Sequence, residues 1–135
     1  MPINVTKPFF DTNILLYLLS ADNKKADISE NLLATGGTIS VQVLNEFVSV
    51  ARRKLKLSFA EIHQILNSIY PLCSIQSISQ TTHEFACHLA ERYDFSIYDA
   101  CIVASALEAE CKILYTEDLQ HNQRISHLKI KNPFL

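Results

Sequence analysis

Hydrophobic and polar residues alternate along this chain with two different periods, one typical of strands and one typical of helices. Phe9–Phe10 is a short apolar segment that predicts a strand reaching back toward Val5. Other segments are apolar or alternate apolar and polar side chains, and they predict strands at 38–41, 73–78, 112–115 and 129–131, the last of them at the edge of the sheet.

The segments between these strands carry helix signals. Ser58 to Glu61 is a capping box that opens a helix, and Pro71 ends that helix. The segment before it has apolar side chains at intervals of three and four residues: Leu44, Phe47, Val48, Ala51 and Leu55. Further helices are expected at 14–19, 27–34, 81–93 and 97–109, whereas 117–126 is polar. Strands that alternate with helices predict an α/β fold with a mainly parallel sheet between helices.

Length and composition favour one domain over residues 1–135, since 48% of the side chains are hydrophobic. The first residues lack the pattern of a signal peptide, and the longest near-apolar run, Ile14 to Leu19, is too short to cross a bilayer. We therefore expect a cytoplasmic protein without a membrane partner. A net charge of −2 argues against a nucleic-acid binder, unless clustered acids hold divalent cations.

The four cysteines show no C-x-x-C spacing and are expected to be reduced. His83 and Cys87, at positions i and i+4, face the same way on a helix, and with His88 they allow a zinc interpretation. Such a site would lack the second half of a tetrahedral ligand set, so the zinc interpretation is weak.

Carboxylates lie close to where the predicted strands end. Asp11 follows Phe9–Phe10, and Asp118 follows strand 112–115. Glu46 lies in the second helical turn after strand 38–41, and Asp99 lies in the first turn of the helix capped by Ser96. Ligands of such folds bind beyond the carboxyl ends of the strands, so these acids are expected to converge. Converging carboxylates repel one another, and Mg²⁺ or Mn²⁺, which prefer oxygen ligands, removes that cost. A site of this kind can orient a phosphodiester and activate a water molecule.

Each acid also has a purely structural interpretation. Asp11 can cap a turn, Glu46 can be a solvated helix acid, Asp99 can close a capping box with Ser96, and Asp118 can be a loop acid or a helix start. The specific signal is the set of four acids in this order.

Four segments resemble the signatures of PIN-domain nucleases, especially the bacterial VapC-type toxins of toxin–antitoxin pairs: Phe10-Asp11-Thr12-Asn13, Ser40 to Phe47, Tyr98-Asp99-Ala100 and Leu114 to Leu119. The resemblance extends from about Pro8 to Phe134. It implies a three-layer α/β/α sandwich with about five strands in the order 3-2-1-4-5, and a ribonuclease that uses Mg²⁺ or Mn²⁺.

The resemblance also implies roles for individual residues. Asp11, Glu46, Asp99 and Asp118 correspond to the catalytic acids that bind the metal, and Thr12, Asn13 and Thr116 correspond to polar residues around it. Proteins of this class form homodimers and bind an antitoxin protein whose tail covers the acidic site.

Two positions differ from the family pattern or leave a choice open. Asn122 stands where many relatives have glycine, and we expect the turn to persist because asparagine tolerates a left-handed backbone. Glu117 competes with Asp118 as a ligand, and Asp118 is assigned because it holds the Thr-x-Asp position.

Basic residues follow Glu46 on the same predicted helix: Arg52, Arg53, Lys54 and Lys56. They either form a solvated helix end, which the helix dipole favours, or contact RNA phosphates. Arg124 is a second candidate for a phosphate contact. No pair of aromatic residues predicts base recognition.

The leading hypothesis is therefore a metal-dependent endoribonuclease that acts as a toxin on RNA. A phosphatase of the haloacid-dehalogenase type would use Asp11 as nucleophile, but its Asp-x-Asp motif requires an acid where Asn13 stands. An inactive PIN-type adaptor for RNA or protein is the alternative, and the presence of all four acids disfavours it.

Overall fold

A computed structural model of the chain describes residues 6–135, so the expected extension of the first strand to Val5 lies outside the described residues. Its elements follow one another in this order: β1 (Phe9–Phe10), α1 (Thr12–Leu16), the 3₁₀ helix η1 (Tyr17–Leu19), α2 (Asn23–Ala34), β2 (Gly37–Ser40), α3 (Val41–Arg53), α4 (Phe59–Ile69), η2 (Tyr70–Leu72), β3 (Cys73–Gln76), α5 (Gln80–Tyr93), α6 (Ile97–Glu108), β4 (Ile113–Tyr115), β5 (Arg124–Ile125) and β6 (Leu128–Lys131).

Within residues 6–135 the strands form one six-stranded sheet in the order β3-β2-β1-β4-β6-β5. All neighbouring strands are parallel except β5 and β6, which form an antiparallel pair. The predicted order of five strands is confirmed, with β6 in the fifth place. The expectation that 129–131 is an edge strand is wrong, because Arg124–Ile125 pairs with β6 on its outer side.

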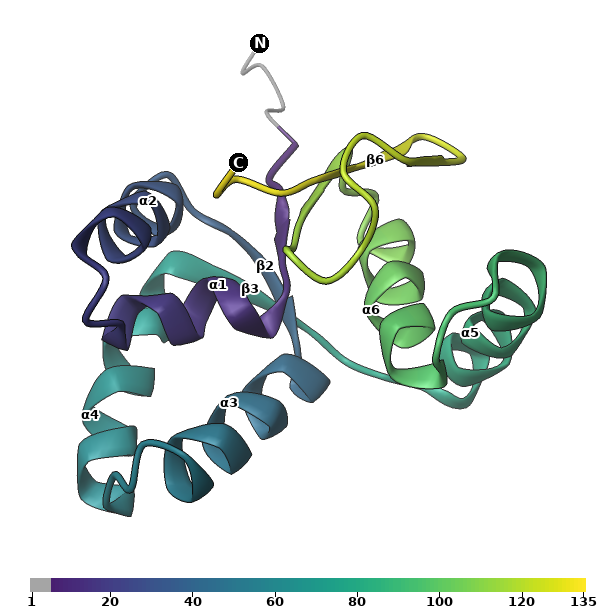
Figure 1. Ribbon diagram of the computed structural model, residues 1–135. Coiled ribbons are helices and arrows are strands. Elements are labelled where there is room, and N and C mark those ends of the chain that lie inside the picture. Colours follow the sequence, from purple (N-terminus) through teal and green to yellow (C-terminus); the bar gives the residue numbers. More distant parts are fainter. Residues whose placement is uncertain (1–5) are drawn as a thin grey trace, which may run out of the picture.

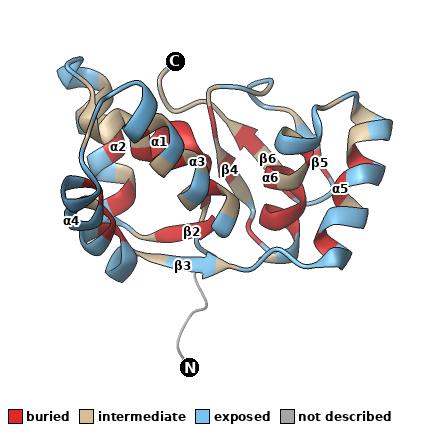
Figure 2. Cartoon of the chain, turned by 90° about the horizontal axis from the view of Figure 1, so that it is seen from below, coloured by how far each residue is buried: buried red, intermediate tan, exposed pale blue. Residues whose placement is uncertain are grey.

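The sheet is the middle layer of a three-layer α/β/α sandwich (Figure 1). Helices α1 to α4 lie on one side of β1, and α5 and α6 lie on the other. Phe9 and Phe10 are fully buried between the layers, and the buried residues follow the central strands and the inner sides of α3 and α6 (Figure 2). None of the helices formed by residues 6–135 is both long and apolar enough to cross a membrane.

Side-chain caps decide where several helices begin. The capping box of Ser58 and Glu61 at the start of α4 is present as predicted. Helix α2 begins at Asn23 rather than at residue 27, because Asp22 accepts hydrogen bonds from the backbone of the first turn. Ser40 ends β2 and accepts from the Val43 backbone N–H, so Val41 belongs to α3 and not to the strand.

Close packing at Gly37 and a left-handed backbone at Asn122 are two local features that the side chains alone do not provide. Gly37 in β2 lies against Phe10, and a Cβ atom there would overlap the Phe10 ring. Glycine therefore permits the close packing of β1 and β2 just before Asp11. Asn122 has a φ of 69°, which confirms the left-handed turn expected at that position.

Candidate active site

Asp11 begins the site at the end of β1, where it is 4% exposed. Its Oδ1 accepts from the Thr12 backbone N–H at 2.7 Å, so Asp11 does cap α1. Its Oδ2 accepts from the Thr116 hydroxyl at 2.8 Å, which joins the ends of β1 and β4. The capping role therefore accounts for only one of the two carboxylate oxygens.

Thr116 and Asn13 connect Asp11 to Asp118. The Thr116 hydroxyl accepts from the Asp118 backbone N–H at 3.0 Å, which fixes the turn after β4. The Asn13 side-chain amide donates to Asp118 Oδ2 at 3.1 Å. Asp118 thus faces the same space as Asp11, although about 100 residues separate them in the sequence.

Glu46 reaches this space from α3. Its Oε2 accepts from the Thr12 hydroxyl at 2.6 Å, and its Oε1 accepts from the Gln42 side chain at 2.8 Å. Gln42 also donates to the Tyr98 carbonyl at 3.1 Å, so it links α3 to the start of α6. Sequence reasoning did not single out Gln42, although its position one helical turn before Glu46 was an available signal.

Asp99 lies half-buried in the first turn of α6. Its backbone N–H donates to the Ser96 hydroxyl at 3.1 Å. Within residues 6–135 the Asp99 carboxylate accepts no hydrogen bond from the Ser96 backbone N–H, so the reciprocal capping box is incomplete. Burial raises the pKa of Asp99, the nearby Ser96 side chain lowers it, and the charges of Asp118 and Glu46 raise it further.

The four acids share one electrostatic environment. Burial raises the pKa of Asp11 from 3.8 to about 7; hydrogen bonds from Thr116 and Thr12 oppose this shift, and the charges of Asp118 and Glu46 add to it. Asp11 is therefore largely protonated below neutral pH in the absence of a cation. Mutual repulsion of this kind is the cost that a bound divalent cation removes.

The donor set suits a hard divalent cation, because carboxylate, amide and hydroxyl oxygens line the site. Among residues 6–135 the buried side-chain oxygen of Asn13 has no hydrogen-bond partner, and it belongs to the residue whose amide N–H contacts Asp118, so it is a further oxygen available as a ligand. Among the described residues, no three His, Cys, Asp or Glu side chains stand close enough together to hold an ion as they lie. The chemistry of the donors fits Mg²⁺ or Mn²⁺, and the carboxylates would have to draw together around the ion.

A cavity of about 250 Å³ opens between α1, α3 and the turn after β4, and Thr12, Glu46 and Asp118 line it. Arg53 lines the same cavity, so the structure brings one predicted phosphate contact to the acids. Arg52 lies elsewhere: it donates to the Leu57 carbonyl at 3.0 Å and covers the Phe59 ring at 4.6 Å. Arg124 is exposed on β5, beside Lys129 and away from this cavity.

Glu117, the alternative to Asp118, is held away from the acids. The Tyr17 hydroxyl donates to Glu117 Oε1 at 2.6 Å, and Lys25 lies 3.9 Å from Oε2. The Lys25 ammonium also covers the Tyr17 ring at 4.5 Å. These contacts favour Asp118 as the acid that serves the site.

The zinc interpretation finds little support in the side-chain positions. His83 Nε2 and Cys87 Sγ lie 3.6 Å apart on α5, as their spacing predicted. No third His, Cys, Asp or Glu joins them in the part of the chain that the structure covers.

The PIN domain model matches residues 9–125, and the chain belongs to the PIN domain family. This family relation confirms the resemblance seen in the sequence, and it extends from β1, which leads into Asp11, to β5. A search of curated proteins found no match.

Solved structures with the same fold come from toxin–antitoxin systems. A toxin–antitoxin complex from Klebsiella pneumoniae has 23% identity and a TM-score of 0.71, covering 93% of this chain and 97% of that one. VapC20 from Mycobacterium tuberculosis, a sarcin–ricin loop cleaving toxin, has 17% identity and a TM-score of 0.65, covering 79% and 86%. DNA-bound VapBC from Salmonella typhimurium has 16% identity and a TM-score of 0.69, covering 96% and 99%.

Proposed function

We propose that this PIN-domain protein is a Mg²⁺- or Mn²⁺-dependent endoribonuclease and the toxin of a toxin–antitoxin pair. The observation that carries the proposal is the convergence of Asp11, Glu46, Asp99 and Asp118, from four separate segments, around one region at the end of β1 and β4. The sarcin–ricin loop cleaving toxin of the same fold supports RNA as the substrate.

In the proposed reaction the four acids would hold the metal. A bound divalent cation lowers the pKa of a coordinated water molecule and stabilises the charge that develops on a phosphodiester. The chain's own polar residues set the acids in place: Thr116 orients Asp11, Thr12 orients Glu46, and Asn13 orients Asp118. Arg53 beside the cavity supplies a positive charge for the phosphate.

The proposed antitoxin contact rests on apolar surface that continues from the site. A cavity of about 290 Å³ lies next to the acid-lined one, shares Leu16 and Val50 with it, and extends to Tyr17, Leu19 and Leu55. An antitoxin tail with apolar side chains fits this groove, and a basic side chain at its end would reach the acids.

A homodimer is proposed from the exposed apolar residues near the site. Val41, Ile97 and Tyr98 stand at the starts of α3 and α6 with exposed fractions of 39%, 38% and 69%. Light scattering on the purified protein tests this part of the proposal, and a monomer at all concentrations would contradict it.

Cleavage of RNA by the purified protein tests the nuclease proposal. We expect cleavage with Mg²⁺ or Mn²⁺ that stops when a chelator is added, and loss of cleavage in Asp99→Asn. Cleavage that continues in chelator would contradict the metal mechanism. RNA binding without cleavage in either metal would favour the inactive adaptor. Coexpression with the product of a short neighbouring reading frame tests the antitoxin, because a toxin should slow growth when expressed alone.

A further inference from the structure

The two faces of the β4–β6–β5 half of the sheet are covered very differently. Leu114, Leu128 and Ile130 are fully buried on one face. The residues that alternate with them, Ile113 and Tyr115 in β4, are only half-buried. Strand residues alternate between faces, so one face of these strands packs on the core and the other, here called the open face, is partly exposed.

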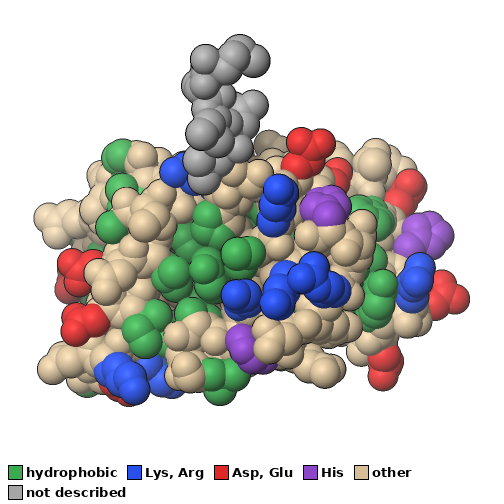
Figure 3. All heavy atoms as spheres, turned by 90° about the horizontal axis from the view of Figure 1, so that it is seen from above, with side chains coloured by type: hydrophobic (Ala, Val, Ile, Leu, Met, Phe, Trp, Pro, Cys, Tyr) green, Lys and Arg blue, Asp and Glu red, His purple; other side chains and the backbone are tan. Residues whose placement is uncertain are grey.

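Cations gather on this open face. Side chains of paired residues in neighbouring strands lie on the same face of the sheet. Lys129 and Lys131 of β6 pair with Ile113 and Tyr115 of β4. Arg124 of β5 pairs with Lys129, so all three basic side chains lie on the open face. Seen from above, Lys and Arg side chains form a row beside a group of hydrophobic side chains (Figure 3). Within residues 6–135 the ion pair of Lys25 and Glu117 is the sole one within 4.0 Å, so no described carboxylate forms an ion pair with this row.

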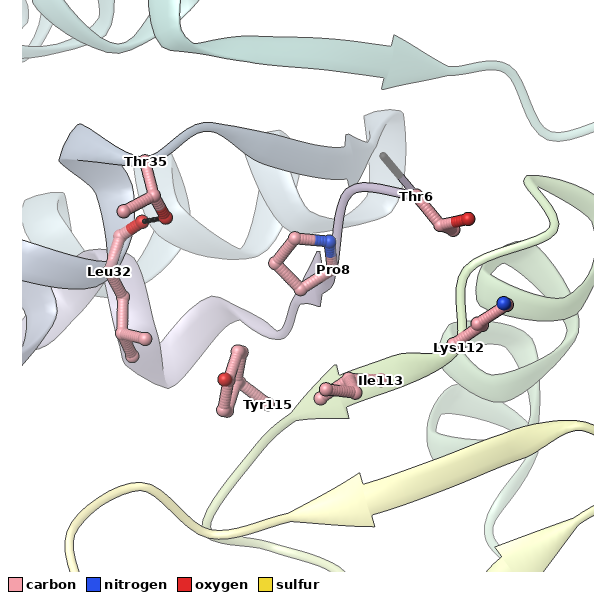
Figure 4. Close-up of a pocket in the computed structure, with 7 residues that line it drawn as sticks. All are labelled: Thr6, Pro8, Leu32, Thr35, Lys112, Ile113 and Tyr115. Atoms are coloured by element: carbon pink, nitrogen blue, oxygen red, sulfur yellow. Dashed lines mark hydrogen bonds between the residues drawn. The ribbon is translucent and has the colours of Figure 1, made fainter. Parts of the chain in front are cut away.

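A cavity of about 350 Å³ lies next to the row, between the chain leading into β1, the end of α2 and β4. Pro8, Leu32, Ile113 and Tyr115 provide apolar walls, and Lys112 stands at one end (Figure 4). This cavity is larger than the one at the acids and lies outside the candidate active site. An aromatic wall beside unpaired cations is the combination that binds single-stranded nucleic acid, because the ring stacks on a base and the cations contact phosphates.

We propose that the open face of β4, β6 and β5 binds a single-stranded segment of the RNA substrate. Phosphates lie along Lys131, Lys129 and Arg124, and one base enters the cavity against Tyr115. The Lys131 carbonyl accepts from the Thr116 backbone N–H at 3.0 Å, so the row ends beside the residue that orients Asp11. The bound strand therefore leads toward the acids. This inference rests on the proposed ribonuclease function and extends it by naming a second contact surface.

The salt dependence of RNA binding tests the row of cations. A labelled single-stranded RNA is titrated by fluorescence anisotropy in chelator, at several salt concentrations, with the wild type and with Lys129→Gln/Lys131→Gln. Each phosphate contact contributes about 0.7 to the slope of log affinity against log salt, so the double variant should lose about 1.4 of that slope. Its affinity at 0.1 M salt should fall about ten- to thirty-fold.

Lys24→Gln/Arg92→Gln is the matched control, because it removes the same charge from exposed positions on α2 and α5. The control should keep the wild-type slope. A slope that is the same in the wild type and the Lys129/Lys131 variant would overturn the inference.

The cavity is tested by two changes at Tyr115. Tyr115→Phe keeps the ring and should bind RNA like the wild type, whereas Tyr115→Leu should lower affinity five- to hundredfold, on the order of one stacked base, with an unchanged salt slope. Thermal unfolding shows whether the leucine variant is folded, and equal affinity of both variants contradicts base stacking.

Cleavage of the same RNA with Mn²⁺ separates this inference from the proposed function. If both hold, the Lys129/Lys131 variant should raise KM and leave kcat unchanged, because the acids are untouched. If the Lys129/Lys131 variant cleaves RNA with an unchanged KM, the proposed binding surface is wrong and the proposed nuclease activity is unaffected. If the wild type binds RNA with a salt slope that depends on the two lysines but does not cleave the RNA, the proposed nuclease activity is wrong and the proposed binding surface stands. If the variant loses antitoxin binding and keeps RNA binding, the face is a protein interface and the RNA assignment is wrong.

Discussion

The raised pKa of Asp11 predicts how the metal-free protein responds to pH. Burial raises this pKa from 3.8 to about 7, so the folded protein retains a proton that the unfolded chain loses near pH 4. For an acid with a raised folded-state pKa, stability is greatest below the unfolded-state pKa, falls as the pH rises toward the folded-state pKa, and is constant above it. A difference of three pKa units corresponds to about 4 kcal/mol between pH 4 and pH 7.

Asp11→Asn removes this dependence, because the amide is neutral throughout the range. One amide oxygen can still accept from the Thr12 backbone N–H, as Oδ1 does now. The new amide N–H would face the Thr116 hydroxyl, which now donates to Oδ2, and rearranging that hydrogen bond costs about 1 kcal/mol. The variant should therefore be about as stable as the wild type at pH 4.5 and more stable at pH 8, by about 3 kcal/mol at most.

Denaturant unfolding in chelator, at steps from pH 4.5 to 8.5, measures this difference. Asp27→Asn is the control, because Asp27 is exposed on α2 and its variant should follow the wild-type curve. Adding Mn²⁺ at pH 8 should stabilise the wild type by mass action and leave Asp11→Asn nearly unchanged. A stability difference between wild type and Asp11→Asn that is constant across the pH range would refute the reasoning.

Three further changes test other parts of the site. Asp99→Asn should keep the stability of the metal-free protein to within about 1 kcal/mol and abolish Mn²⁺ binding and RNA cleavage, whereas near-native cleavage would remove Asp99 from the site. Gly37→Ala should destabilise the fold by about 1–3 kcal/mol in thermal unfolding, because the added methyl group displaces the Phe10 ring; an unchanged Tm would contradict the packing argument. Tyr17→Phe removes the hydroxyl that holds Glu117, so we expect a changed metal affinity in calorimetric titration with little change in stability, and identical metal affinity would show that Glu117 needs no restraint.

Much of the fold could be predicted because its signals are local. The capping box of Ser58 and Glu61 depends on hydrogen bonds within one turn, and the start of α4 follows from it. Strand β5 was missed for the opposite reason. It has only two residues, Arg124 and Ile125, and exists through its pairing with β6. Strand propensity depends on such pairing, and a polar segment of sequence does not reveal it.

The sequence by itself determined which acids are candidates, because strand ends and helix starts are visible in the pattern of hydrophobic residues. It left the choice between neighbours open. Arg52 and Arg53 are adjacent in α3, yet Arg53 lines the acid cavity and Arg52 covers the Phe59 ring. Successive helix residues point about 100° apart, so packing against other elements decides which of them reaches the site.

The partners of the acids were decided by the tertiary structure alone. Thr12 donates to Glu46 across 34 positions of the sequence, and Asn13 donates to Asp118 across 105. Both members of each pair are present in the sequence, but the sequence does not indicate that they lie close together in space. Only the parallel order of β2, β1 and β4 brings their ends to one edge of the sheet, where the hydrogen bonds form and the charges of Glu46 and Asp118 raise the pKa values of Asp11 and Asp99.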